Sequence, residues 1–206
     1  MKTKIITFVL ALFFSGMVLL VSLFSSSSLN YKFDLQPGGN FSTASFPDIN
    51  YHLPFPGRIQ PINVLWPIKV IRDKLVLSLT VDKLEKAKVA LLLADKRLAS
   101  GAILVEQGRY EEASEVFRKS QIYLDYSCRL VSEVSAQTAG ATSFVHVLNL
   151  ASLKHREVLE KSITRFPEDA RPIINEVLDG PKLVFEKSSQ ILNERESKPS
   201  ENPFGD

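Results

Sequence analysis

Apolar and small residues recur at alternating steps of three and four through residues 82–134, and this pattern predicts two long helices. The spacing places each set on one helix face. Large and small residues alternate along these faces, which lets two helix axes approach closely. A turn at Gln107-Gly108-Arg109 joins the two sets, so the stretch is predicted to form an antiparallel helical hairpin. The two sets are Leu84, Ala87, Leu91, Ala94, Leu98, Gly101 and Val105, and Tyr110, Ala113, Phe117, Ser120, Leu124, Ser127, Val131 and Val134.

Three further helices are predicted around this hairpin. A short helix runs from Trp66-Pro67 to about residue 80, and Asp82 with Glu85 forms a capping box for the helix that follows. Helices are also expected over residues 142–165 and 169–196, the last kinked at Gly180-Pro181 but continuous because its apolar phase persists. The short helix takes its apolar face from Leu65, Ile68, Ile71, Leu75 and Leu79. The predicted fold class is therefore all-α, with an antiparallel bundle of one short and four long helices over residues 62–196.

The N-terminal segment, residues 1–28, has the pattern of a membrane anchor. Residues 5–24 carry no charge, and such a run as a helix spans roughly 30 Å, the thickness of a hydrocarbon core. Lys2 and Lys4 precede the run, which predicts a cytoplasmic N-terminus and an extracytoplasmic helical domain. A cleaved signal peptide, with Ser25 to Ser27 near the cleavage site and secretion as the result, is the alternative. The apolar run exceeds the core of such a peptide, so an uncleaved single-pass signal anchor is favoured.

Two segments outside the bundle show no sustained periodicity. Residues 29–61 are poor in charge and rich in proline, glycine and aromatic residues, which predicts an extended linker. The aromatic content of its stretch around residues 51–57 favours docking of that stretch onto the protein's own bundle. The polar tail, residues 197–206, is predicted to be disordered.

Several motifs along the chain carry a family resemblance. They are Tyr51-His52-Leu53-Pro54-Phe55-Pro56-Gly57, then Trp66-Pro67 and Arg72-Asp73, then Ala94 with Arg97-Leu98, and finally Gly108-Arg109-Tyr110. With this pattern, residues 51–125 resemble a bacterial family of membrane-anchored, extracytoplasmic helical domains of unknown function. Ser100 departs from the glutamate usual there, and Arg58, Ile62 and Val64 also depart from the family pattern. The resemblance implies a helical fold and carries over no catalytic residue.

Charge and cysteine content narrow the function classes. Of 25 basic residues, Lys2 and Lys4 precede the apolar run, so the remaining 23 balance the 23 acidic residues. A balanced chain argues against nucleic acid as a partner, because phosphate binding needs a basic face, and also against attraction to an anionic lipid surface. The only cysteine, Cys128, excludes an intrachain disulfide, and its place beside the hairpin seam predicts a small buried apolar residue.

The candidate chemical groups favour structural roles. His146 and His155 are half a turn out of phase, so they are not expected to hold one metal, and His155 on the apolar stripe is predicted to be a hydrogen-bonded core residue. His52 has no acidic or cysteine partner nearby in the sequence. The group Asp95, Lys96 and Arg97 is interpreted as a salt-bridged helix flank in preference to a binding site. Glu111, Glu112 and Glu115 fit a helix N-terminus, with Glu115 placed for Arg118 and Lys119.

These observations predict no catalytic, cofactor-binding or metal-binding residues and no cofactor. We therefore expect a non-enzymatic protein-binding or scaffolding module of the cell envelope, tethered to the membrane through residues 5–24, with another envelope protein as its partner. The alternatives are an envelope chaperone or stress-sensing domain, or an enzyme without a recognisable motif. An enzyme would need a concave pocket with converging polar groups, and a chaperone a broad exposed apolar groove.

Overall fold

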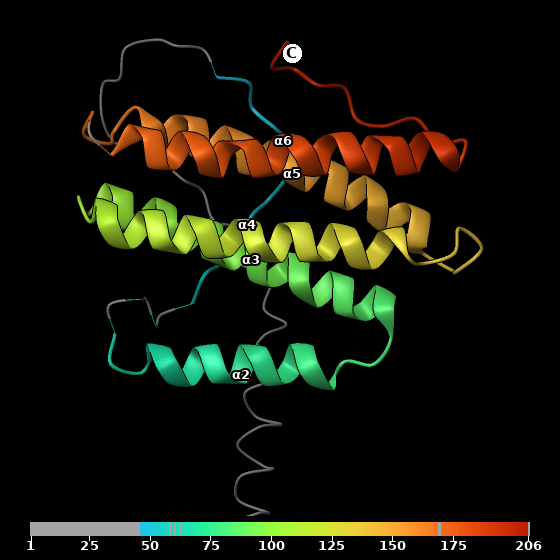
Figure 1. Ribbon diagram of the computed structural model, residues 1–206, viewed down its shortest axis with the longest axis horizontal. Helices are drawn as coiled ribbons and strands as arrows, with labels where there is room; N and C mark the ends of the chain where they lie inside the picture. The colour runs from blue at the N-terminus through green and yellow to red at the C-terminus, as the bar shows by residue number, and fades with distance from the viewer. Residues whose placement is uncertain (1–45, 58, 60, 62, 169, 206) are drawn as a thin grey trace, which may run out of the picture. The chain divides into compact units, whose positions relative to one another are not determined.

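The computed structural model describes residues 46–57, 59, 61, 63–168 and 170–205, and its elements there are five helices (Figure 1). They are α2 (Trp66–Leu79), α3 (Lys83–Glu106), α4 (Tyr110–Ser132), α5 (Ala141–Ile163) and α6 (Arg171–Glu194). The predicted all-α fold of this part is confirmed. The apolar run 5–24 and most of the linker lie outside the described residues. Within those residues, every helix is too short or too polar to cross a membrane.

The predicted hairpin of α3 and α4 is confirmed, and its small seam positions have specific neighbours. A Cβ placed on Gly101 would lie 2.4 Å from the ring of Phe117, so only glycine lets the two helices pack this closely. The hydroxyls of Ser120 and Ser127 each donate across the seam, at 2.8 Å, to the backbone carbonyls of Ala94 and Ala87 respectively. A small residue in the seam therefore either leaves room for an aromatic ring of the other helix, as Gly101 does, or is a serine that forms a hydrogen bond across the seam.

Helices α5 and α6 pack on the hairpin and complete the core. Gly140 begins α5 in the left-handed region, with φ of 79°, which glycine adopts without strain. Helix α6 continues through Pro181, as predicted. Leu124, Leu148 and Leu192, from α4, α5 and α6, belong to one buried cluster, which places the core between these helices.

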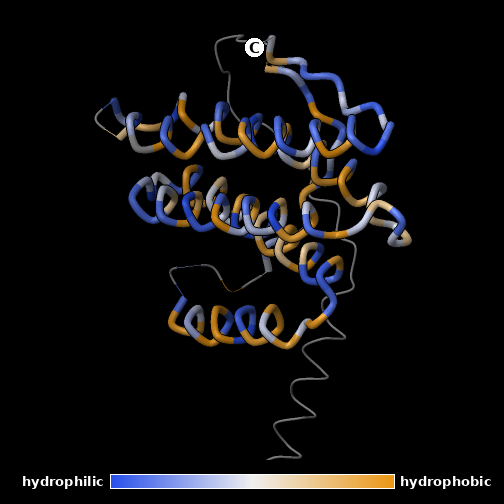
Figure 2. The backbone as a smooth tube through the Cα atoms, turned by 45° about the vertical axis from the view of Figure 1, so that its right-hand side comes forward, coloured by the Kyte–Doolittle hydropathy of each residue, from blue (hydrophilic) through white to orange (hydrophobic). Residues whose placement is uncertain are grey.

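Helix α2 lies beside α3 at the edge of the bundle and presents the opposite face from the predicted one (Figure 1). The predicted apolar positions Leu65, Ile68, Ile71, Leu75 and Leu79 are all exposed, and the buried residue of α2 is Asp73. The helix is apolar on both sides, as the orange turns in Figure 2 show, with Trp66, Val70, Val76 and Leu77 half-buried on the inner side. Periodicity therefore located the helix but did not determine which side faces the core.

The C-terminal residues 197–205 make defined contacts with α5, whereas the sequence predicted disorder there. The Ser197 hydroxyl lies 2.7 Å from Nε2 of His146, and the backbone N–H of Ser200 donates to Asn149 at 2.9 Å. The guanidinium of Arg156 lies 4.2 Å from the centre of the Phe204 ring. One aromatic side chain and two hydrogen bonds thus hold a segment whose composition is otherwise polar.

Candidate functional site

The segment before α2, residues 46–57, is bound to the bundle, and we call it the strap. The backbone N–H of Ile49 donates to the carboxylate of Glu157 on α5 at 2.9 Å. Nζ of Lys154 donates to the carbonyl of Ile49 at 3.2 Å and to Glu157 at 2.9 Å. The side chains of Ile49 and Leu53 are buried. The prediction that this segment docks on its own bundle is confirmed.

The strap also closes a buried polar network between α3 and α5. The Tyr51 hydroxyl donates to Oδ2 of Asp95 at 2.6 Å, and Nε2 of His155 lies 2.9 Å from Oδ1 of the same carboxyl. On the other side, Nδ1 of His155 lies 3.4 Å from the amide nitrogen of Gln121 on α4. Four side chains from three helices and the strap are therefore linked in one network, and the imidazole among them is fully buried.

A linked Tyr, Asp and His can transfer protons in an active site, but here their burial favours a structural role. His155 has an exposed fraction of zero and Asp95 of 3%, so neither meets solvent. The prediction of His155 as a hydrogen-bonded core residue is confirmed. The interpretation of Asp95 and Arg97 as a salt-bridged helix flank is wrong, because both are buried and their partners lie on other segments.

Asp73 is the centre of a second polar cluster, between α2 and α3. Its carboxylate lies 2.7 Å from Arg72 and 3.6 Å from the buried guanidinium of Arg97. That guanidinium lies between the rings of Trp66 and Tyr123, at 6.0 and 4.6 Å from their centres, and its Nε has no hydrogen-bond partner. The sequence named Asp73 only as part of the family motif Arg72-Asp73, and the signal for its burial was its position opposite the row of aliphatic residues.

Two lysines border this cluster and are partly desolvated. Nζ of Lys69 donates to the carbonyl of Pro56 at 2.6 Å and lies 4.8 Å from the centre of the Trp66 ring. Burial lowers the pKa of Lys69 to about 8, and the neighbouring cations Lys96, Arg72 and Arg97 act in the same direction. Burial, followed by the charge of Arg72, also lowers the pKa of Lys96. The cluster therefore has four basic side chains around one carboxylate.

The other residues considered in the sequence remain apart from these clusters. Cys128 is buried as predicted, and burial raises the pKa of its thiol to about 11, which disfavours the reactive thiolate. Glu115 pairs with Arg118 and Lys119, as predicted, on the exposed face of α4. His52 is exposed on the strap. Glu157 and Lys154, which hold the strap, were missed because their partner is backbone more than a hundred positions away.

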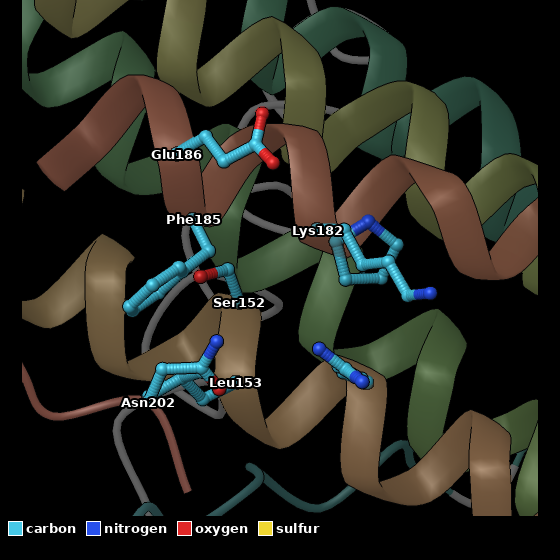
Figure 3. A pocket seen from close by; sticks show the side chains of 8 residues that line it. Ser152, Leu153, Lys182, Phe185, Glu186 and Asn202 are labelled. Atoms are coloured by element: carbon cyan, nitrogen blue, oxygen red, sulfur yellow. The ribbon is translucent and has the colours of Figure 1, made fainter. Parts of the chain in front are cut away.

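Two surface depressions are present among the described residues. One, of about 120 Å³, lies between α5, α6 and the C-terminal segment and is lined by Ser152, Leu153, Arg156, Pro181, Lys182, Phe185, Glu186 and Asn202. Figure 3 shows the Phe185 ring near Leu153 and Asn202, whereas the Glu186 carboxylate points away from them. The other, of about 410 Å³, lies between α4 and α6 and includes Cys128, Arg129, Lys187, Ile191 and Arg195. The first is smaller than the roughly 300 Å³ at which sites for drug-sized ligands begin, and the second exceeds that size.

The Tyr51 hydroxyl predicts a loss of stability in alkali. Burial, the Asp95 charge and the hydrogen bond to it all raise the pKa of Tyr51 above its ordinary value. Above pH ~10 the unfolded chain loses this proton and the folded one keeps it, so the free energy of unfolding falls as pH rises. Urea unfolding of residues 29–206, measured from pH 9 to 11, gives the free energy of unfolding at each pH. This free energy should fall less steeply with pH in Tyr51→Phe than in the wild type. An equal dependence on pH in the two proteins would contradict the buried hydrogen bond of Tyr51.

Comparison with known proteins places the chain in a family. The family described as Domain of unknown function (DUF5667) matches residues 58–169. The chain belongs to this family. The match includes α2 to α5, the Asp73 cluster and the residues Asp95, Gln121 and His155 of the other network, but not Tyr51, and it ends before α6. No curated protein and no solved structure matches the chain.

Proposed function

We propose that this DUF5667 protein is a membrane-tethered, extracytoplasmic module that binds or scaffolds another protein of the cell envelope and does not catalyse a reaction. The uncharged run 5–24, with Lys2 and Lys4 before it, supports a tether with the bundle outside. The family match supports a helical domain without an assigned activity.

The observation that carries the proposal is the attachment of the strap to α3 and α5. Ile49 is bound through Glu157 and Lys154, and Tyr51 through Asp95 and His155. The tether therefore continues into backbone that is bonded to the bundle, which is the connection a scaffold requires. The groups best suited to acid–base chemistry are the same groups that hold the strap, and they are buried. The exposed faces of α4 and α6, with the depression beside Arg129 and Lys187, remain available to a protein partner.

Proximity labelling tests this function. A labelling enzyme fused after residue 206 of the full chain should enrich a small set of extracytoplasmic envelope proteins. The comparison variant carries Tyr51→Phe, which removes the hydrogen bond between the strap and Asp95, and it should change the labelled set while the chain remains in the membrane fraction. Labelling of cytoplasmic proteins would contradict the orientation. Turnover of a small molecule by the purified protein, with no enriched neighbour, would contradict a scaffolding role.

A further inference from the structure

Helix α2 carries an exposed row of five aliphatic side chains, which we call the outer row. The row begins at the N-cap residue and continues along one side of the helix at steps of three and four. Its members and their exposed fractions are Leu65 50%, Ile68 63%, Ile71 59%, Leu75 48% and Leu79 76%. Single exposed aliphatic residues are ordinary on a protein surface, but a contiguous row marks an interaction surface.

Basic side chains border the outer row. Arg72, the exposed Lys74 and Lys69 lie on α2 itself, with Lys69 bound on the inner side to the carbonyl of Pro56, and Lys96 lies behind them on α3. Asp73, the only acidic residue of α2, is buried and pairs with Arg72 and Arg97, so it offsets the charge of Arg72 but not that of the exposed Lys74. The Nε atom of the buried Arg97 has no hydrogen-bond partner and adds an unsatisfied donor to the same cluster. An apolar row with a cationic border is the pattern of helices that lie in the interface of an anionic membrane.

We propose that α2 docks on the surface of an anionic bilayer, with the outer row among the upper acyl chains and the basic border at the headgroup phosphates. This inference rests on the proposed membrane tether. Between residue 24, where the apolar run ends, and residue 46, where the strap begins, 21 residues span at most about 70 Å. The bundle is therefore always close to the bilayer from which it is tethered, which favours the bilayer as the occupant.

A second copy of the chain fits this surface less well. At 14 residues, α2 is about 21 Å long and 10 Å wide, so it projects about 200 Å², well below the roughly 800 Å² that each partner contributes to a stable interface. Pairing two such helices would also bring Arg72 and Lys74 of one copy toward the same cations of the other. A bilayer has neither limit, because its surface is continuous and its phosphates are negative.

A tryptophan moved into the outer row makes this docking measurable in the full chain. Trp66, the only tryptophan, lies half-buried on the inner side of α2. The reporter chain therefore carries Trp66→Phe and Leu75→Trp, so that its only tryptophan lies in the outer row. In vesicles of phosphatidylcholine and phosphatidylglycerol with brominated acyl chains, we expect the emission to fall at least twofold relative to unbrominated vesicles. We expect less quenching in phosphatidylcholine alone. Equal quenching in both lipids would overturn the role of the basic border.

The matched variants are Ile71→Glu on α2 and Ile122→Glu on α4, because both isoleucines are 59% exposed. In the reporter chain, Ile71→Glu should abolish the quenching with helix content unchanged, and Ile122→Glu should leave it as it was. A reporter chain that resists alkaline extraction yet is not quenched would overturn only the docking of α2. A chain that is extracted would overturn the tether as well. If quenching is absent, two results would assign the outer row to a protein partner instead. One is crosslinking between two copies of the chain through α2. The other is the loss of one envelope protein from the labelled set of Ile71→Glu.

Discussion

Replacing Asp95 with alanine is expected to lower the free energy of unfolding by about 3 kcal/mol or more, since it leaves two polar groups unpaired at once. The Tyr51 hydroxyl loses its acceptor at 2.6 Å, and Nε2 of the fully buried His155 loses its partner at 2.9 Å. A buried donor or acceptor without a partner costs about 1–3 kcal/mol. Chemical unfolding of residues 29–206, followed by circular dichroism, measures the loss.

Glu115→Ala is the matched control for Asp95→Ala. Glu115 is also an acidic residue on a bundle helix with two partners, Arg118 and Lys119, but its side chain is 50% exposed. Exposed pairs of this kind contribute about 0–1 kcal/mol, so the control should unfold nearly as the wild type does. Similar losses in both variants would contradict the assignment of Asp95 to a buried network.

Gly101→Ala is expected to destabilise the protein by about 1–3 kcal/mol, although alanine is the better helix former. The new methyl group would lie 2.4 Å from the Phe117 ring, which is fully buried and so cannot turn out into solvent. Thermal unfolding of residues 29–206 measures the change. In a Phe117→Leu background the same substitution should cost less, because the ring that it meets is gone.

Gly180→Ala provides the comparison in α6. Its methyl group would lie 3.0 Å from Oε1 and 3.4 Å from Cβ and Cγ of Gln121, so this side chain, whose amide lies near His155, has to shift by only a few tenths of an ångström. The substitution should therefore be neutral or stabilising, by up to about 1 kcal/mol from helix propensity. If the two alanine variants shifted the melting temperature equally, the close packing of α3 on α4 at Gly101 would be refuted.

The hairpin was predictable from the sequence because small and large residues alternate along both of its helices and Gly108 marks the turn between them. Leu84 to Val105 and Tyr110 to Val131 each repeat at steps of three and four, and the small members sit where the partner helix comes closest. The capping of α3 was predictable for a similar reason, since Asp82 accepts from the N–H of Glu85 within one turn. Local chemistry of this kind needs no knowledge of the rest of the fold.

The orientation of α2 was not predictable in this way. Val70, Val76 and Leu77 on its inner side are as apolar as Ile68, Ile71 and Leu75 on its outer side. Only the pairing of Asp73 with Arg97, which lies 24 positions away, selects the inner side, and such pairs leave no periodic signal. The same holds for Tyr51 and Asp95, which are 44 positions apart, and for Asp95 and His155, which are 60 apart.

The strap has a mechanical consequence. Because Ile49 is bonded to α5 and Tyr51 to α3, tension arriving from the N-terminal side meets these bonds before it reaches α2. The contacts of Ser197 and Ser200 with α5 receive tension from the C-terminal side. Helix α5 is thus the element on which a pull from either end of the chain converges. Rupture of the Tyr51 bond would expose the Asp95 carboxyl and the imidazole to water, so a stretched molecule would present chemical groups that the relaxed molecule conceals.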